Sequence, residues 1–192
     1  MILLRAPRCF AVLAGAAILA GCGQSQPADE ASQEAASGPS AMKLTSNAFE
    51  NGQALPSEFT CDGAGHSPQL QWSEPPAGTE SFALVVEDPD APQGTFRHWG
   101  VYDIPMSARQ LNTGAAQAGT SGLKQAKNDF DEVGYGPPCP PPGDKPHHYH
   151  FRLAALDIVE LPAAPIMAAD IGRIMGKHVL GSAELVATYR RK

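Results

Sequence analysis

The chain has 192 residues, with 14 Lys and Arg against 20 Asp and Glu, and a formal net charge of −6. Its basic residues form no stripe, which makes nucleic acid and anionic lipid surfaces poor partners. Any anion site in such a chain has to be a local arrangement of donor groups.

The N-terminus is typical of a bacterial lipoprotein signal peptide. Arg5 and Arg8 precede an apolar run over 9–20, which is shorter than the about 20 apolar residues that span a bilayer. The run ends in Leu-Ala-Gly-Cys, which resembles a lipobox. We therefore predict removal of residues 1–21 and lipidation of Cys22, with several acyl chains anchoring the protein. An ordinary signal peptide that releases a soluble periplasmic protein is the alternative.

The lipidated cysteine is predicted to begin a tether over 22–41. This stretch contains Gln, Ser, Ala, Pro and acidic residues with almost no large apolar side chain, so it cannot bury enough surface to fold. The folded domain is predicted over 42–192, a length of one domain. We expect it in the bacterial cell envelope, facing the periplasm. Gly23 favours the outer membrane, because the usual retention signal at that position is Asp.

Two cysteines remain in the domain, Cys61 and Cys139. Their spacing is not of the Cys-x-x-Cys type, so zinc binding and thioredoxin-like chemistry have no support. In an oxidising compartment a pair of cysteines favours a disulfide. It would join an early loop to a proline-rich loop.

Short apolar stretches separated by Gly and Pro predict β-strands along the domain. The stretch 81–87 is apolar on both faces, as in a central strand that is covered on each side. Residues 110–127 show little periodicity and predict a long surface connection, with at most a short strand near Leu123. A helix is predicted over 168–176. The other predicted strands are 42–49, 69–72, 96–104, 149–157 and 183–190. These elements predict a mainly β fold, an antiparallel β-sandwich with one or two peripheral helices near the C-terminus.

The stretch 134–151 reads GYGPPCPPPGDKPHHYHF and carries five prolines between positions 137 and 142. Proline fixes its own backbone and extends its predecessor, so this loop is stiff. A stiff loop loses little entropy on binding and suits a preformed pocket. Strand alternation directs His147 and Tyr149 to the pocket and sends His148 and His150 to the opposite face.

Three segments carry most of the chemistry-bearing residues: Asp-Pro-Asp-Ala-Pro at 88–92, His-Trp at 98–99, and the proline-rich loop with His147 and Tyr149. Together with Phe-Thr-Cys-Asp-Gly from Phe59, they resemble the phosphatidylethanolamine-binding protein family. The nearer match is its bacterial branch, the Raf-kinase-inhibitor-like proteins. Further matching motifs are Ser-Pro-x-Leu-x-Trp at 67–72 and Ala-x-Leu-Val-Ala-Thr-Tyr-Arg at 183–190. The resemblance extends from about residue 42 to residue 190.

The resemblance implies a β-sandwich of the Greek-key type with a small anion pocket at one end. The matching lining residues are Asp88, His98, His147 and Tyr149, with Pro92 and Pro138 shaping the wall. Known members bind phosphate, acetate or phosphorylated head groups there. Histidine and tyrosine can donate hydrogen bonds to an oxyanion, whereas Asp88 would repel it and is expected to orient a histidine. We expect Asp90 to cap the turn that follows.

Histidine and aspartate residues of these segments could also build two other kinds of site. A zinc site built from His147, His148 and His150 is disfavoured because strand alternation separates these side chains, so we expect no metal and no other cofactor. A hydrolase that uses Asp88 and His98 lacks a nucleophile: no Gly-x-Ser-x-Gly is present and the Cys139 thiol is expected to be oxidised.

We therefore expect a non-enzymatic binding protein. A different class of function stays open, in which surface loops make the protein an interaction or inhibitor module for an envelope enzyme or another partner.

Overall fold

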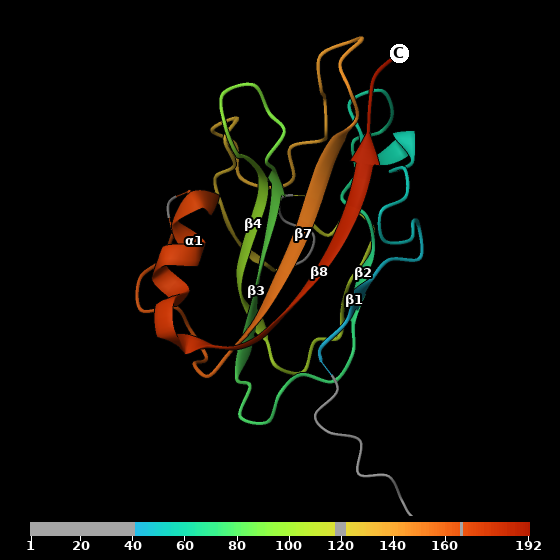
Figure 1. Ribbon diagram of the computed structural model, residues 1–192. Helices are drawn as coiled ribbons and strands as arrows, with labels where there is room; N and C mark the ends of the chain where they lie inside the picture. The colour runs from blue at the N-terminus through green and yellow to red at the C-terminus, as the bar shows by residue number, and fades with distance from the viewer. Residues whose placement is uncertain (1–40, 118–121, 166) are drawn as a thin grey trace, which may run out of the picture. The chain divides into compact units, whose positions relative to one another are not determined.

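The computed structural model describes residues 41–117, 122–165 and 167–192 (Figure 1). The predicted signal peptide, the lipidation site Cys22 and nearly all of the predicted tether lie outside these ranges. Within them, no helix is long and apolar enough to cross a membrane.

The described chain forms two antiparallel β-sheets and one α-helix, which confirms a mainly β sandwich. The smaller sheet has the order β1-β2-β5 and the larger has the order β6-β4-β3-β7-β8. The smaller sheet comprises β1 (Leu44–Thr45), β2 (Leu70–Trp72) and β5 (Gln110–Leu111). The larger sheet comprises β3 (Ser81–Asp88), β4 (Phe96–Pro105), β6 (Lys124–Ala126), β7 (His147–Leu156) and β8 (Val179–Tyr189). The helical segments are α1 (Ala168–Met175) and the 3-10 turns η1 (Ser57–Phe59) and η2 (Gly176–His178).

Strand β3 is the centre of the larger sheet, where it pairs with β4 on one side and β7 on the other. Phe82, Leu84 and Val86 point into the main core between the two sheets. Ala83 and Val85 point to the opposite face, into a second cluster beneath α1. The strand is thus covered on both faces, as its continuous apolar sequence predicts.

Helix α1 packs closely on β4, beside β3 (Figure 1). A Cβ atom on Gly100 of β4 would lie 2.8 Å from the Ala168 Cβ and 2.8 Å from the Ile171 Cδ1. Only glycine therefore allows the helix to approach the sheet this closely. The helix ends one residue before its predicted limit, at Met175.

Strand pairing extends or shortens several predicted elements. Strand β7 begins at His147, two residues early, because His147 pairs with Tyr189 of β8. Strand β5 lies inside the predicted surface connection, where Leu111 pairs with Leu70 of β2 and is buried. Strand β1 is shorter than predicted and covers only Leu44–Thr45.

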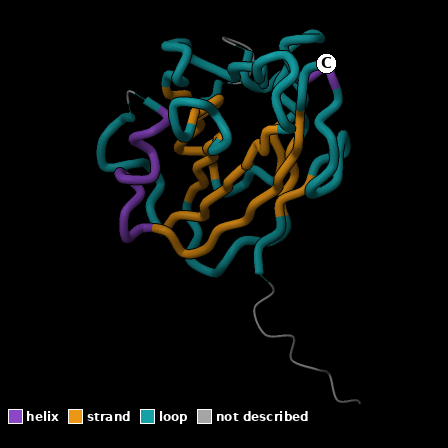
Figure 2. The backbone as a smooth tube through the Cα atoms, turned by 45° about the horizontal axis from the view of Figure 1, so that its top comes forward, coloured by secondary structure: helices purple, strands orange, loops and turns teal. Residues whose placement is uncertain are grey.

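The ends of three strands of the larger sheet meet at one end of the sandwich. Strand β3 ends there at Asp88, while β4 and β7 begin there at Phe96 and His147. Long loops gather at this end, as Figure 2 shows. The segment that leads into β1, drawn in blue, lies toward the other end, where β3 begins (Figure 1). The loops therefore enclose the three strand ends and are placed to build a pocket.

Candidate functional site

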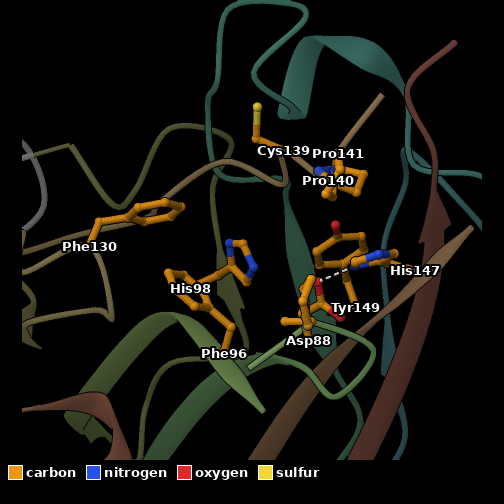
Figure 3. Close-up of a pocket in the computed structure, with 11 residues that line it drawn as sticks. Asp88, Phe96, His98, Phe130, Cys139, Pro140, Pro141, His147 and Tyr149 are labelled. Carbon is orange, nitrogen blue, oxygen red and sulfur yellow. Dashed lines mark hydrogen bonds and ion pairs between the residues drawn. The ribbon is translucent and has the colours of Figure 1, made fainter. Parts of the chain in front are cut away.

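A cavity of about 220 Å³ opens at this end of the sandwich (Figure 3). It lies between the turn after β3, the start of β4, the start of β7 and the proline-rich loop. Five of the six residues expected to form the pocket line it: Asp88, Pro92, His98, His147 and Tyr149. The other lining residues are Ala91, Phe96, Phe130, Cys139, Pro140 and Pro141. The cavity is large enough for a small ligand and is walled mainly by apolar side chains.

The sixth expected residue, Pro138, is not part of this lining. Pro140 and Pro141 form the wall instead, while the Pro138 carbonyl accepts a hydrogen bond from the Cys61 backbone N–H at 3.1 Å. The proline-rich loop thus supplies the wall two or three residues later than expected, because residue 138 is engaged with the loop that carries Cys61.

Asp88 orients His147, and both side chains are almost completely buried. The Asp88 Oδ2 atom accepts a hydrogen bond from the His147 Nδ1 atom at 2.7 Å. The Asp88 Oδ1 atom accepts one from the backbone N–H of Asp90 at 2.9 Å. Asp88 therefore orients the histidine and caps its own turn with the same carboxylate.

The expectation that Asp90 caps this turn is wrong. The turn directs its carboxylate outward, where Oδ2 accepts hydrogen bonds from the His148 backbone N–H and from His148 Nδ1, at 2.9 and 2.7 Å. The Lys145 ammonium lies 3.0 Å from Oδ1. Adjacent histidines of β7 are thus each held by an aspartate of the same turn, one inside the pocket and one outside.

His147 has a carboxylate at each ring nitrogen. Besides Asp88 at Nδ1, the Asp144 Oδ2 atom lies 3.4 Å from Nε2. Burial alone would lower the pKa of His147, but the Asp88 hydrogen bond and the charges of Asp88 and Asp144 outweigh it, so this pKa is raised above its ordinary value. At a given pH, His147 is therefore protonated to a greater extent than an isolated histidine.

His98 has the opposite character. Its Nδ1 lies 2.8 Å from the Gly136 carbonyl oxygen, and burial lowers its pKa. The Gly136 N–H in turn donates to the His98 carbonyl oxygen at 2.7 Å. A Cβ atom on Gly136 would lie 2.5 Å from the Phe130 ring, so this exchange requires glycine. Sequence reasoning gave neither Gly136 nor Phe130 a role; the Gly-Pro-Pro motif was the only signal for the former.

Tyr149 is fully buried beside His98 and His147, with ring centroids 5.3 and 6.5 Å away. No acceptor among the described residues makes a well-formed hydrogen bond with its hydroxyl. Burial, together with the charge of Asp88 and its interaction with the hydroxyl, holds the pKa of Tyr149 well above its usual range, so the hydroxyl keeps its proton. Tyr149 therefore brings a protonated hydroxyl to the pocket, where it can donate to a ligand.

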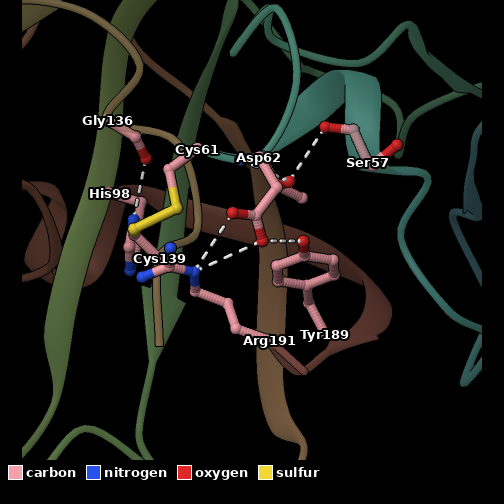
Figure 4. Close-up of a disulfide and its surroundings, with 9 residues drawn as sticks. Ser57, Cys61, Asp62, His98, Gly136, Cys139, Tyr189 and Arg191 are labelled. Atoms are coloured by element: carbon pink, nitrogen blue, oxygen red, sulfur yellow. Dashed lines mark hydrogen bonds and ion pairs between the residues drawn. A yellow bond between two sulfur atoms is a disulfide. The ribbon is translucent and has the colours of Figure 1, made fainter. Parts of the chain in front are cut away.

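The predicted disulfide joins Cys61 to Cys139, with Cα atoms 5.3 Å apart (Figure 4). Cys139 lines the pocket. Next to Cys61, the Asp62 carboxylate accepts hydrogen bonds from the Tyr189 hydroxyl and the Arg191 Nε atom. The disulfide therefore links the pocket wall to an early loop that is itself attached to the end of β8.

His148 and His150 lie outside the pocket, as alternation along β7 predicts. His148 is exposed and contacts Asp90, while the His150 Nδ1 atom lies 2.9 Å from Glu184. Within the described ranges, no group of three or more His, Cys, Asp or Glu side chains is placed to hold a metal ion.

The described residues that line the pocket include no serine and no threonine, and Cys139 is oxidised. Ser67 is buried outside this lining and accepts a hydrogen bond from the Ala116 N–H at 3.2 Å. The described lining thus offers hydrogen-bond donors and an imidazole oriented by Asp88, with no serine, threonine or free cysteine beside them.

Comparison with known proteins finds similar sequences in bacteria. The family model described as "Phosphatidylethanolamine-binding protein" matches residues 45–190. A UPF0098 protein of Aquifex aeolicus is 42% identical over 156 residues, which cover 80% of this chain and 91% of that protein. The UPF0098 protein YbcL of Escherichia coli is 39% identical over 163 residues, covering 79% and 89%.

Two solved structures share this fold. The crystal structure of E. coli YbcL, described as a new member of the mammalian PEBP family, has a TM-score of 0.74 at 37% identity and covers 79% of this chain and 99% of that one. A putative homolog from Chlamydia trachomatis has a TM-score of 0.71 at 37% identity, with the same coverage of both chains.

Proposed function

Because this chain belongs to the phosphatidylethanolamine-binding protein family, we propose that it is a non-enzymatic binding protein whose pocket takes a small anion. Phosphate, a carboxylate and a phosphorylated head group are the candidates. The observation that carries the proposal is the buried Tyr149 hydroxyl, for which no acceptor among the described residues has good geometry and which lines the same cavity as His147, whose pKa is raised. An oxyanion satisfies both groups at once.

The electrostatics of the pocket support this ligand class. The two Asp88 oxygens accept hydrogen bonds from His147 Nδ1 and from the Asp90 backbone N–H. Each oxygen of this carboxylate therefore already has a donor inside the protein. Apolar side chains such as Phe96, Phe130 and Pro141 complete the wall, and a charge-assisted hydrogen bond is stronger where water is excluded. The described lining residues include no serine, threonine or free cysteine, which favours binding over turnover.

We also propose where in the cell the protein lies. The Leu-Ala-Gly-Cys sequence that ends at Cys22 supports a lipid anchor in the bacterial envelope, with the domain facing the periplasm and the outer membrane favoured. Mass spectrometry of the N-terminal peptide tests the lipid directly. Replacing Cys22 by Ser should release the protein from the membrane fraction, and a variant that stayed there would contradict the anchor.

Isothermal titration calorimetry with inorganic phosphate, acetate and phosphoethanolamine tests the pocket. His147→Gln should weaken binding at least tenfold, because it removes a charged donor worth about 1.5–3 kcal/mol. His178→Gln is the matched control, since His178 also contacts a carboxylate, that of Asp157 at 2.8 Å, but lies at the other end of the sheet. Equal binding by His147→Gln and wild type would show that the pocket is assigned wrongly. No binding of any of the three anions would leave the interaction-module hypothesis.

A further inference from the structure

The backbone around His98 fixes which of its ring nitrogens carries a proton. The Nδ1 atom lies 2.8 Å from the Gly136 carbonyl oxygen. A carbonyl oxygen can only accept a hydrogen bond, so Nδ1 must donate and must be protonated. The return hydrogen bond from the Gly136 N–H to the His98 carbonyl, at 2.7 Å, holds the loop and the strand in this register.

The surroundings of His98 keep the ring neutral. The side chain is buried and is surrounded by the rings of Phe96, Phe130 and Tyr149, with centroids 5.0, 5.8 and 5.3 Å away. Burial lowers the pKa of His98 more strongly than the charges of Asp88 and Asp129 raise it, and the charge of His147 lowers it further. A neutral imidazole with its proton on Nδ1 has a lone pair on Nε2. His98 therefore offers the pocket an acceptor.

Strand β7 also lines the cavity and offers donors. Tyr149 has a protonated hydroxyl with which no acceptor among the described residues makes a well-formed hydrogen bond. His147 is oriented through Nδ1, and its Nε2 faces only the partly exposed Asp144 carboxylate at 3.4 Å. His147 and Tyr149 thus donate hydrogen bonds into the pocket, whereas His98 accepts one. A fully ionised anion has only acceptor oxygens, so it cannot satisfy all three residues.

We propose that the pocket selects an oxyanion that still carries a proton, namely a protonated phosphoryl group. Its unprotonated oxygens accept from His147 and Tyr149, and its P–OH group donates to His98 Nε2. This inference rests on the proposed function and narrows the ligand from small anions in general. Sulfate has a similar size and the same tetrahedral shape but no proton near neutral pH, so it sets an oxygen lone pair against the Nε2 lone pair.

The test is a comparison of inorganic phosphate with sulfate, by calorimetry on the full-length chain at one near-neutral pH. Phosphate should bind about 10- to 100-fold more tightly, because an unmade hydrogen bond to a buried acceptor is penalised on this scale. Equal affinities would overturn the inference and leave the anion pocket standing. Failure of both anions to bind would overturn the pocket as well.

A variant and a spectroscopic measurement make the test specific to His98. His98→Gln places an amide group that can donate near the position of Nε2, so the preference for phosphate over sulfate should fall toward one. His178→Gln, at the far end of the sheet, should leave the preference unchanged. Because His98→Gln perturbs a buried site, ¹⁵N NMR of the imidazole in the wild-type protein gives a second readout. A proton on Nε2 of His98 in the phosphate complex would disprove the inference.

Discussion

Replacing Tyr149 by Phe should stabilise the protein when no anion is bound and weaken its binding of an anion. No acceptor among the described residues makes a well-formed hydrogen bond with the buried hydroxyl, a state that costs about 1–3 kcal/mol, whereas Phe fills the same space without that penalty. We expect the free energy of unfolding to rise by about 1 kcal/mol, equivalent to about 2–4 °C in melting temperature for a domain of this size. In the complex the same hydroxyl donates to an anion, a hydrogen bond worth about 1.5–3 kcal/mol. Phosphate affinity should therefore fall roughly 10- to 150-fold.

Urea denaturation of the ligand-free protein and calorimetry with phosphate measure the two effects separately. Tyr135→Phe is the matched control, because the Tyr135 hydroxyl donates to the Phe59 carbonyl at 3.0 Å and does not line the pocket. Its loss should destabilise the protein by about 1 kcal/mol and leave phosphate binding intact. If Tyr149→Phe destabilises the free protein as Tyr135→Phe does, the Tyr149 hydroxyl must be hydrogen-bonded in the free protein. If it leaves phosphate affinity unchanged, the hydroxyl does not contact the anion.

The other predictions concern the charges and the covalent link around the pocket. Asp144→Asn should tighten phosphate binding by up to about fivefold, because it removes a partly exposed carboxylate that competes for His147 Nε2; Asp157→Asn is the control, and weaker binding by Asp144→Asn would contradict the competition. In an NMR titration, His147 should titrate above the ordinary value of 6.5 and His98 below it. The stabilisation that His147 contributes is thus fully present below pH 6.5 and is lost as the pH rises through its folded-state pKa. His98 acts in the opposite sense, because its unfolded form takes up a proton as the pH falls below 6.5; matching titrations of the two residues would refute this assignment. Reduction of the disulfide should cost about 2–4 kcal/mol of stability in urea denaturation and weaken phosphate binding through the wall, and unchanged binding after complete reduction would show that the wall does not depend on it.

The sequence was most informative where one local pattern had one structural solution. A short continuous apolar run bounded by turn residues favours a strand covered on both faces, and β3 is such a strand. Alternation from Tyr149 separated His147 from His148 correctly, because successive residues of a strand must face opposite sides. The Cys61–Cys139 disulfide followed from there being two cysteines in the predicted domain.

The sequence was uninformative where tertiary contacts decide among equivalent residues. Nothing local tells which prolines of a run face inward, so Pro138 was chosen where Pro140 and Pro141 line the cavity. Strand β5 has two residues and exists because Leu111 completes a core that other segments build. The acceptor character of His98 depends on a carbonyl 38 residues away in the chain, and no spacing in the sequence encodes it.

The pocket and the start of the described chain lie at opposite ends of the sandwich, with β3 running between them. The eight residues of that strand separate the two ends by about 25 Å. A biosensor chip, a bead or a fusion partner coupled directly ahead of residue 41 therefore joins the domain about 25 Å from the pocket. Protein immobilised in this way should keep its pocket accessible to a small ligand in solution.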